Sequence, residues 1–222
     1  MARVLVTGAR RGIGLEFARQ YAAAGWDVIA TVRDPGKAEE LAALGVRVEP
    51  LDMRDFAALA AFPERLGREP LDLFIANAGI SRAKWIRSRE DAEAWQEVHA
   101  VNAVAPTLLA ESLLAMVEAA GGRMAAISSQ MGSIADSSGG YIGYRASKAA
   151  LNAAWRALAL GWSGRDVTLL LLHPGWVQTD MGGPQAPLPV EESVAGMRRV
   201  IAGLPRRASG AFVDYRGAAV PW

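Results

Sequence analysis

Short apolar runs alternate with amphipathic stretches along the whole chain. The apolar runs predict strands at Arg3–Thr7, Asp27–Val32, Val46–Leu51, Leu71–Ala76, Arg123–Ser128, Val167–Leu172 and Ala211–Tyr215. Most of these runs are apolar at consecutive positions, a pattern typical of strands that are covered on both faces. The amphipathic stretches predict helices at Ile13–Ala24, Pro35–Leu44, Asp55–Arg65, Ala92–Ala119, Tyr144–Trp162 and Val190–Ala202.

This order of elements favours an α/β fold. Strands that alternate with helices predict a parallel sheet with helices on both faces. Pro106 lies inside the long fourth helix and predicts a kink there. The segment Gly182–Pro189 is rich in glycine and proline and predicts a loop within the domain. Because no linker or repeat interrupts the pattern, we expect residues 1–222 to form a single domain.

Composition and charge narrow the class of protein. The 222 residues are 51% hydrophobic and 21% charged, which fits a globular chain and argues against a disordered one. The 24 basic residues nearly balance 23 acidic ones, so no bulk charge favours nucleic acid. With no cysteine and two histidines, thiolate chemistry is excluded and a multi-histidine zinc site is not expected. No apolar run reaches the roughly 18 residues of a membrane span, and we expect a cytoplasmic protein without a membrane partner.

A glycine-rich turn follows the first predicted strand and opens the first predicted helix. Residues 7–14 read Thr-Gly-Ala-Arg-Arg-Gly-Ile-Gly. Glycines at such a turn permit a close approach to a pyrophosphate, which then binds at the helix N-terminus. Three glycines alone also suit an ordinary strand–helix turn, but this position favours dinucleotide binding. The expected contacts are Gly8, Arg10, Arg11, Gly12, Ile13 and Gly14.

The end of the second predicted strand indicates which dinucleotide is bound. An acidic residue there usually binds the ribose hydroxyl of NAD, whereas arginine suits the 2′-phosphate of NADP. The residue expected to distinguish the two dinucleotides is Val32 or Arg33, with Arg33 in place of an acid, and Arg11 is placed to contact the same phosphate. We expect NADP(H). NAD(H) is the alternative, in which Asp34 acts as the carboxylate and both arginines face solvent.

Tyr144 and Lys148 place a phenol and an ammonium one helical turn apart. The ordinary pKa of tyrosine is about 10, so catalysis near neutral pH requires a nearby cation that stabilises the phenolate. We predict that Lys148 supplies this charge. Tyr141 is the alternative, although Arg145 stands four residues after it. A tyrosine and a lysine at this spacing are usually no more than a pair on a helix surface. A catalytic role is therefore predicted only if other motifs in the sequence support it.

Polar residues follow several predicted strands. Asn77-Ala78-Gly79 follows the fourth strand, Ser128 and Ser129 lie at the end of the fifth, and His173-Pro174-Gly175 follows the sixth. Because ligands bind at the carboxyl ends of strands in open α/β sheets, these residues predict a cleft.

Large apolar residues stand in loops at the edge of this predicted cleft. They either line an apolar substrate pocket, or belong to the edge of the core or to a subunit contact: Trp85, Ile86, Met131, Trp176 and Met181. We expect His173 to be packed and not a base.

With these motifs, the sequence resembles the short-chain dehydrogenase/reductase family over nearly its whole length, in particular C-factor-like and carbonyl-reductase-like members. The resemblance implies one Rossmann-type doubly wound domain with about seven parallel strands. It also implies hydride transfer between a nicotinamide and a small carbonyl or alcohol substrate. The implied catalytic residues are Asn102, Ser129, Tyr144 and Lys148. Asn102 lies 27 residues before Ser129, which favours Ser129 over Ser128.

The resemblance also implies roles for these residues. Tyr144 would donate a proton to the developing alkoxide, and Ser129 would donate a second hydrogen bond to the same oxygen. Lys148 would lower the pKa of the phenol and bind the nicotinamide ribose. Asn102 would hold a water molecule that links Lys148 to solvent. The alternative function is a dinucleotide-binding regulatory or signalling protein with little turnover.

Further cofactor contacts follow from the same resemblance. Asp52 is similar to the family's adenine-contacting acid, and Thr179 to the residue that contacts the carboxamide. The implied contacts are Asp52, Met53, Asn77, Ala78, Gly79, Tyr144, Lys148, Pro174, Gly175, Val177 and Thr179. The chain departs from many members in the longer spacing of 15 residues between Ser129 and Tyr144. Small residues at Ala149, Ala150, Ala153 and Ala154 predict a homodimer or homotetramer, or else pack on the sheet.

Overall fold

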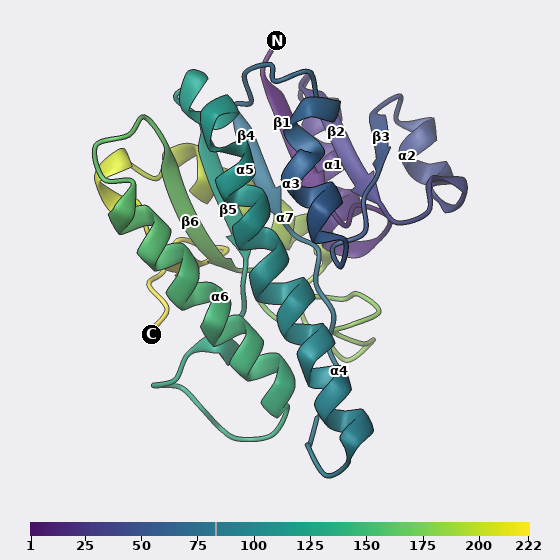
Figure 1. Cartoon of the computed structure of the whole chain (residues 1–222), viewed down its shortest axis with the longest axis vertical. Helices are drawn as coiled ribbons and strands as arrows, with labels where there is room; N and C mark the ends of the chain where they lie inside the picture. The colour runs from purple at the N-terminus through teal and green to yellow at the C-terminus, as the bar shows by residue number, and fades with distance from the viewer. Residues whose placement is uncertain (83) are drawn as a thin grey trace.

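The computed structural model describes residues 1–82 and 84–222, which contain one seven-stranded parallel sheet (Figure 1). Its strand order is β3-β2-β1-β4-β5-β6-β7. The strands are β1 (Arg3–Thr7), β2 (Asp27–Val32), β3 (Arg47–Pro50), β4 (Leu73–Ala76), β5 (Arg123–Ile127), β6 (Thr168–His173) and β7 (Ala211–Asp214). The order reverses between β1 and β4, which is the position where open α/β sheets bind ligands.

Helices cover both faces of the sheet, as the sequence predicted. They are α1 (Gly12–Ala23), α2 (Glu39–Ala43), α3 (Phe56–Arg65), α4 (Arg89–His99), α5 (Ala105–Ala119), α6 (Ile142–Gly161) and α7 (Val190–Gly203). Figure 1 shows α3, α5 and α6 in front of the sheet, with α1 and α7 behind it. Leu5 of β1 packs into the front core, and its neighbours Val4 and Val6 pack into the back core. Successive strand residues point to opposite faces, so an apolar run serves both cores.

The predicted helix Pro35–Leu44 is only partly helical. A 3₁₀ turn spans Pro35–Lys37, and α2 begins after it at Glu39. The Asp34 carboxylate accepts a hydrogen bond from the Gly36 N–H at 3.1 Å, which stabilises the turn. Ala38 then adopts a non-helical φ of −120°, and the two segments remain separate.

The long helix predicted at residues 92–119 is interrupted by a π-helical turn, close to the position where Pro106 predicted a kink. The turn spans Ala100–Val104 between α4 and α5 (Figure 1). Pro106 has no N–H, so the carbonyl of Asn102 lacks its α-helical donor. The helix responds by widening, and the Ala105 N–H donates to the carbonyl of Ala100, five residues earlier.

The helical span Arg89–Ala119 also has the length and hydropathy that a membrane crossing requires. Its mean hydropathy reaches 1.6 over an 18-residue window, whereas the sequence analysis identified no such run. However, 56% of this window is buried inside the protein. The apolar residues Leu109, Leu113 and Val117 lie in the front core, and their hydropathy is that of a core helix.

The last residues fold back along β7. Ala219 forms an antiparallel bridge with Val213, and the Val220 N–H donates to the carbonyl of Phe212 at 2.9 Å. The main-chain oxygen of Trp222 then accepts a hydrogen bond from the Ala135 N–H at 2.9 Å. The tail therefore connects β7 to the loop that follows β5.

Candidate active site

The glycine-rich turn lies against the segment that leaves β4. Gly8 and Gly12 have φ angles of +66° and +56°, in the left-handed region that favours glycine. A Cβ on Gly8 would lie 2.8 Å from the Cα of Ala78, and one on Gly14 would lie 2.4 Å from Nδ2 of Asn77. The backbones therefore approach too closely for any side chain at these two positions.

Asn77 and Thr7 lock this approach. Nδ2 of Asn77 donates to the carbonyls of Thr7 at 2.9 Å and Gly8 at 3.2 Å. In return, Oγ1 of Thr7 accepts from the backbone N–H groups of Asn77 at 3.1 Å and Ala78 at 3.2 Å. The ends of β1 and β4 thus form one rigid unit at the switch point of the sheet.

The N-terminus of α1 opens beside this unit. Its N-cap residue, Arg11, makes no side-chain capping hydrogen bond, and the first turn holds no acidic residue. The first N–H groups of a helix lack internal partners and attract anions together with the helix dipole. A narrow glycine cradle that faces these donors fits the pyrophosphate of a dinucleotide.

The arginines expected to contact the cofactor are exposed, among them Arg33 and Arg11, which were expected near the 2′-phosphate. Arg33 lies just after β2, and Arg10 lies in the glycine-rich turn. Arg11 forms an ion pair with Asp180, in the loop after β6, and both side chains are exposed. An exposed ion pair contributes at most about 1 kcal/mol, so an anionic ligand can compete with Asp180 for Arg11.

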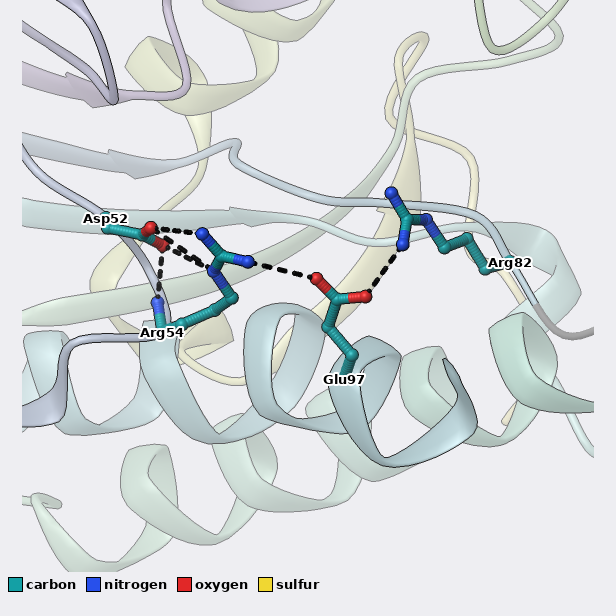
Figure 2. A network of polar contacts seen from close by, with 4 residues as sticks. All are labelled: Asp52, Arg54, Arg82 and Glu97. Carbon is teal, nitrogen blue, oxygen red and sulfur yellow. Dashed lines mark hydrogen bonds and ion pairs between the residues drawn. The ribbon is translucent and has the colours of Figure 1, made fainter. Parts of the chain in front are cut away.

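Asp52 takes part in a polar network that the sequence analysis missed. Figure 2 shows Arg54 binding the Asp52 carboxylate, with Nη2 2.6 Å from Oδ2 and the backbone nitrogen 2.9 Å from Oδ1. These bonds with Arg54 hold the pKa of Asp52 below its usual value. Arg54 also contacts Glu97 of α4 at 3.5 Å, and Glu97 pairs with Arg82 at 2.9 Å (Figure 2). The side chain of Met53 is buried in the front core.

Tyr144 and Lys148 lie one turn apart on α6, as predicted. Nζ of Lys148 is 5.8 Å from the centre of the Tyr144 ring and donates to the carbonyl of Ile127 at 2.8 Å. Burial lowers the pKa of Lys148 to about 8. Burial also raises the pKa of Tyr144 to about 12, against the opposing effect of a hydrogen bond with Ser129. This direction is opposite to our prediction, because desolvation of the phenol dominates and the buried amine bonds to Ile127.

The two candidate serines have different surroundings. Ser128 is buried, and its hydroxyl donates to Oδ1 of Asn152 at 2.5 Å. Ser129 caps the 3₁₀ turn at Gln130–Gly132, and its Oγ accepts from the Met131 N–H at 3.1 Å. This acceptor role leaves the Ser129 O–H as a donor beside Tyr144. The geometry therefore favours Ser129.

The alternative tyrosine lies outside this group. Tyr141 precedes α6 in a left-handed conformation with φ of +50°, and its side chain is exposed. Nζ of Lys84 lies 5.0 Å from the centre of its ring. Tyr141 therefore belongs to the rim of the site.

Asn102 lies in the π-helical turn, and its side chain is fully engaged. Oδ1 accepts from the Ile80 N–H at 2.9 Å, while Nδ2 donates to the Ile80 carbonyl at 2.8 Å and to Oγ of Ser147 at 3.0 Å. This amide therefore ties the segment after β4 to α6, and both of its donors have protein partners. The expected water molecule would therefore not be held by these two donors, and Pro106 has no N–H to donate to the main-chain carbonyl of Asn102.

Gly79 keeps a space open between two of these polar groups. A Cβ at this position would lie 3.4 Å from Oδ1 of Asn102 and 3.7 Å from Nζ of Lys148. The segment after β4 therefore brings the π-helical turn and the buried amine to one place.

The segment after β6 closes the other side of the site. The Ser193 hydroxyl donates to the carbonyl of Pro174 at 2.6 Å, which ties the segment to α7. Gly175 has φ of +86°, and Val177 forms a β-bridge with Leu188. Further along, a Cβ on Gly12 would lie 3.3 Å from the methyl group of Thr179. The predicted residues 174–179 therefore reach the glycine-rich turn.

His173 precedes this segment and fits the expectation of a packed residue. Burial lowers its pKa, against the opposing charge of Asp214. Its Nδ1 is buried and finds no hydrogen-bond partner among residues 1–82 and 84–222. A neutral ring in a packed position accounts for both observations.

Large apolar side chains at the edge of the site face solvent. Trp85, Trp176 and Met181 are 44%, 57% and 54% exposed, so they do not form the edge of the core.

A separate cavity of about 590 Å³, which the sequence analysis did not predict, opens at the amino ends of the strands between α1 and α7. It lies at the opposite edge of the sheet from Tyr144 and has no part in this site.

The polar groups that converge at the carboxyl edge can transfer a proton to an oxygen atom. The Tyr144 phenol holds its proton at neutral pH, Ser129 supplies a neighbouring hydroxyl, and Lys148 supplies an amine whose pKa of about 8 lies near neutral pH. These groups share the edge of the sheet with a cradle that fits a dinucleotide.

This chain is similar in sequence and in structure to proteins of one family of dehydrogenases and reductases. Residues 2–187 match the family model described as short chain dehydrogenase. The chain is 42% identical to the C-signal of Myxococcus xanthus over 74% of this chain and all of that protein. It is 37% identical to the NADPH-bound carbonyl reductase from chicken fatty liver, with a TM-score of 0.90 over 100% of this chain and 99% of that one. A carbonyl reductase from Pseudomonas aeruginosa in complex with NADP is 37% identical, with a TM-score of 0.82 over all of both chains.

Proposed function

This chain belongs to the short-chain dehydrogenase/reductase family of oxidoreductases, and from that premise we propose that it is an NADPH-dependent reductase of small carbonyl compounds. The observation that carries the proposal is the position of the Tyr144 phenol beside the Ser129 hydroxyl, at the sheet edge that also carries the glycine cradle. In this proposal NADPH, when bound, supplies the hydride. The protein supplies orientation and the proton.

Tyr144 is the proton donor in this proposal. With a pKa of about 12, the phenol holds its proton at neutral pH and is ready to donate it to a developing alkoxide. Ser129 donates a hydrogen bond to the same oxygen, a contact that strengthens as negative charge develops. The raised pKa of Tyr144 suits the reduction of a carbonyl compound, which needs the protonated phenol. The oxidation of an alcohol would instead need the phenolate at the start.

Lys148 and Asn102 support this proton donor. Lys148 has a pKa of about 8, so it exchanges a proton near neutral pH and can restore the one that Tyr144 gives up. Its position one turn from Tyr144 also places it to bind the ribose of the nicotinamide. Asn102 holds the polypeptide around Lys148, and its main-chain carbonyl offers an acceptor for a water molecule that leads to solvent.

NADP(H) is the proposed cofactor, and Arg33, Arg10 and Arg11 are the proposed contacts of its 2′-phosphate. Support comes from these exposed cations near the glycine cradle and from the two similar reductases whose structures hold NADPH or NADP. For Arg33→Ala, the ratio of kcat/KM for NADPH over NADH should fall at least tenfold, because an arginine–phosphate contact is charge-assisted. An unchanged ratio would exclude Arg33 as the contact.

The main test of the proposed function is turnover by a Tyr144→Phe variant. NADPH oxidation is measured with a panel of aldehydes, ketones and quinones. The variant should lose about 100-fold to 10,000-fold in kcat, while its affinity for NADPH, measured by fluorescence titration, stays close to that of the wild type. Near-normal turnover in the variant would contradict the role of Tyr144.

The second candidate is a regulatory or signalling protein that binds a dinucleotide and turns over little substrate. The 42% identity to a relative named C-signal favours keeping this candidate. The same panel separates the two functions. Tight binding of NADPH without oxidation by any member of the panel would support the regulatory function and contradict the reductase.

A homodimer or homotetramer is also a proposal. On α6, Ala153 is exposed, and Ala149, Ala150 and Ala154 are half-buried, so this helix offers a surface of small residues. Light scattering of the purified protein at several concentrations measures the size of the assembly. A monomer at every concentration would contradict the proposal.

A further inference from the structure

The loop between β4 and α4 carries an unusual number of basic residues. They are Arg82, Lys84 and Arg87, and Arg89 follows them as the first residue of α4. Two of them have acidic partners, because Arg82 pairs with Glu97 at 2.9 Å and Arg89 pairs with Glu93 at 2.7 Å. Within residues 1–82 and 84–222, the ion pairs of the structure include none made by Lys84 or Arg87.

The nearest acids along the chain are engaged at the start of α4. Asp91 forms a capping box with Ser88 and accepts from the Arg87 backbone N–H at 2.8 Å. Hydrogen bonds from its own backbone N–H and from Ser88 hold the pKa of Glu90 below its usual value. Both carboxylates complement the positive end of the helix dipole, and, in the part of the chain that the structure describes, neither forms an ion pair with the side chain of Lys84 or Arg87.

The two remaining cations lie over aromatic rings. Nζ of Lys84 is 5.0 Å from the centre of the Tyr141 ring, and Cζ of Arg87 is 5.4 Å from the centre of the Trp85 ring. Tyr141 and Trp85 are each 44% exposed. Each cation therefore stands beside an accessible flat apolar surface, an arrangement that suits a ligand with an anionic group and an aromatic body.

This surface borders the catalytic group. The Ile142 N–H donates to the carbonyl of Lys84 at 3.3 Å, which attaches the loop to the first turn of α6. Tyr141 precedes that turn, and Tyr144 lies within it. In Figure 1 the lower ends of α4 and α6 lie side by side, consistent with the contacts between the two helices.

We propose that Lys84 and Arg87 form a subsite for the anionic group of the substrate, whose carbonyl is attached to an aromatic body. The proposal rests on the proposed reductase function and specifies its substrate class. A carboxylate can pair with either cation, and the Arg87 guanidinium can bind both of its oxygens. The faces of Tyr141 and Trp85 offer stacking surfaces for the ring that carries the carbonyl.

The test compares 4-carboxybenzaldehyde with benzaldehyde. In each reaction the aldehyde carbon gains hydride from NADPH and its oxygen gains a proton, which gives the benzyl alcohol and NADP⁺. We expect kcat/KM to be about tenfold higher for the carboxylated aldehyde, and 0.5 M KCl should reduce that preference. In the double variant Lys84→Ala/Arg87→Ala, the preference should be lost.

Arg89→Ala is the matched control, because Arg89 directly follows this loop as the first residue of α4 but is paired with Glu93. This variant should keep the preference for the carboxylated aldehyde. An equal or lower kcat/KM for that aldehyde in the wild type would overturn the subsite, and so would an equal loss in Arg89→Ala.

A binding measurement separates this proposal from the proposed function. If neither aldehyde is reduced, the reductase function fails, but the subsite is still tested by titrating the protein and NADPH with benzoate and with the neutral benzamide, followed by NMR. Tighter binding of benzoate that is lost in the double variant supports the subsite. Equal binding of benzoate and benzamide overturns it.

Discussion

The cofactor side and the substrate side of the site are built in different ways. At the glycine-rich turn, backbone atoms and the hydrogen-bonded side chain of Asn77 leave no room for a Cβ at Gly8 or Gly14. At the rim, exposed side chains such as Trp85 and Trp176 stand on loops. The comparison teaches that the glycine cradle is defined by backbone approach, whereas the proposed substrate side consists of side chains that loops can exchange without disturbing the sheet.

The largest effect should come from placing a side chain in the cradle. In Gly14→Ala, the new Cβ meets Nδ2 of Asn77 at 2.4 Å and the carbonyl oxygen of Gly8 at 2.5 Å, so the backbone has to move. We expect a loss of about 3 kcal/mol in the free energy of unfolding and a loss of NADPH binding, measured by urea denaturation and by fluorescence titration.

Gly161→Ala is the control for this substitution. Gly161 ends α6 and has open space where a Cβ would stand. The variant should be as stable as the wild type or more stable by up to about 1 kcal/mol, because alanine favours a helix over glycine. A similar loss in both variants would show that the cradle is not specially restrictive.

A pair of serine variants separates reaction chemistry from packing. Ser129→Ala should lower kcat about 100-fold with little change in stability, because it removes a donor to the developing oxyanion. Ser128→Ala should lower the free energy of unfolding by about 1–3 kcal/mol, because it removes the hydroxyl that donates to the buried Oδ1 of Asn152. Reversal of the two phenotypes would exchange the roles of the serines.

Buried Lys148 makes stability depend on pH. Burial lowers the pKa of this amine to about 8 in the folded protein, whereas in the unfolded chain the pKa returns to the ordinary lysine value of 10.5. Between these values the unfolded chain holds a proton that the folded protein has released, so unfolding takes up a proton and the free energy of unfolding rises with pH. We expect a rise of about 2 kcal/mol between pH 8 and pH 10 in the wild type that is absent in Lys148→Met.

Urea denaturation at several pH values measures this rise. The tyrosines Tyr21 and Tyr144, whose pKa values are about 12, act in the opposite direction above pH 10, so the series stops there. The same pH dependence in both proteins would show that Lys148 does not lose its proton in this range.

The smallest effect should come from the network in Figure 2. In Arg54→Ala, the Asp52 carboxylate loses its main hydrogen-bond donor, so the pKa of Asp52 should rise toward its usual value. An NMR pH titration of this carboxyl group measures the change, and KM for NADPH should change only a few-fold. A fall in the pKa of Asp52 would contradict the assigned cause.

The sequence predicted the elements that a local pattern defines. The bounds of β1 and β2 agree with the prediction, because each strand is a continuous apolar run that ends at polar or turn residues. The sequence also predicted that the polar residues after β4, β5 and β6 lie at one edge of the sheet, since parallel strands bring their carboxyl ends together. The segment 35–44 was predicted less well, because the side-chain cap of Asp34 stabilises a 3₁₀ turn where the pattern indicates a continuous helix.

Features that depend on distant contacts could not be predicted in this way. The link from Arg54 to Glu97 joins residues 43 positions apart, and the contact of Lys84 with Tyr141 depends on the approach of α4 to α6. The direction of the Tyr144 pKa shift depends on the depth of burial, which a spacing of four residues does not contain. The hydrogen bonds of the Asn102 side chain could not be predicted either, because its partners Ile80 and Ser147 are distant in the sequence.

The returning tail has a consequence for how the protein behaves at high concentration. An uncovered edge strand offers unpaired backbone groups to other chains and invites aggregation. The bridge from Ala219 to Val213 covers part of the β7 border, and β3, on the far border, is short and carries charge at Arg47 and Glu49. Both borders are thus protected against strand addition, and removal of residues 218–222 should make the protein more prone to self-association.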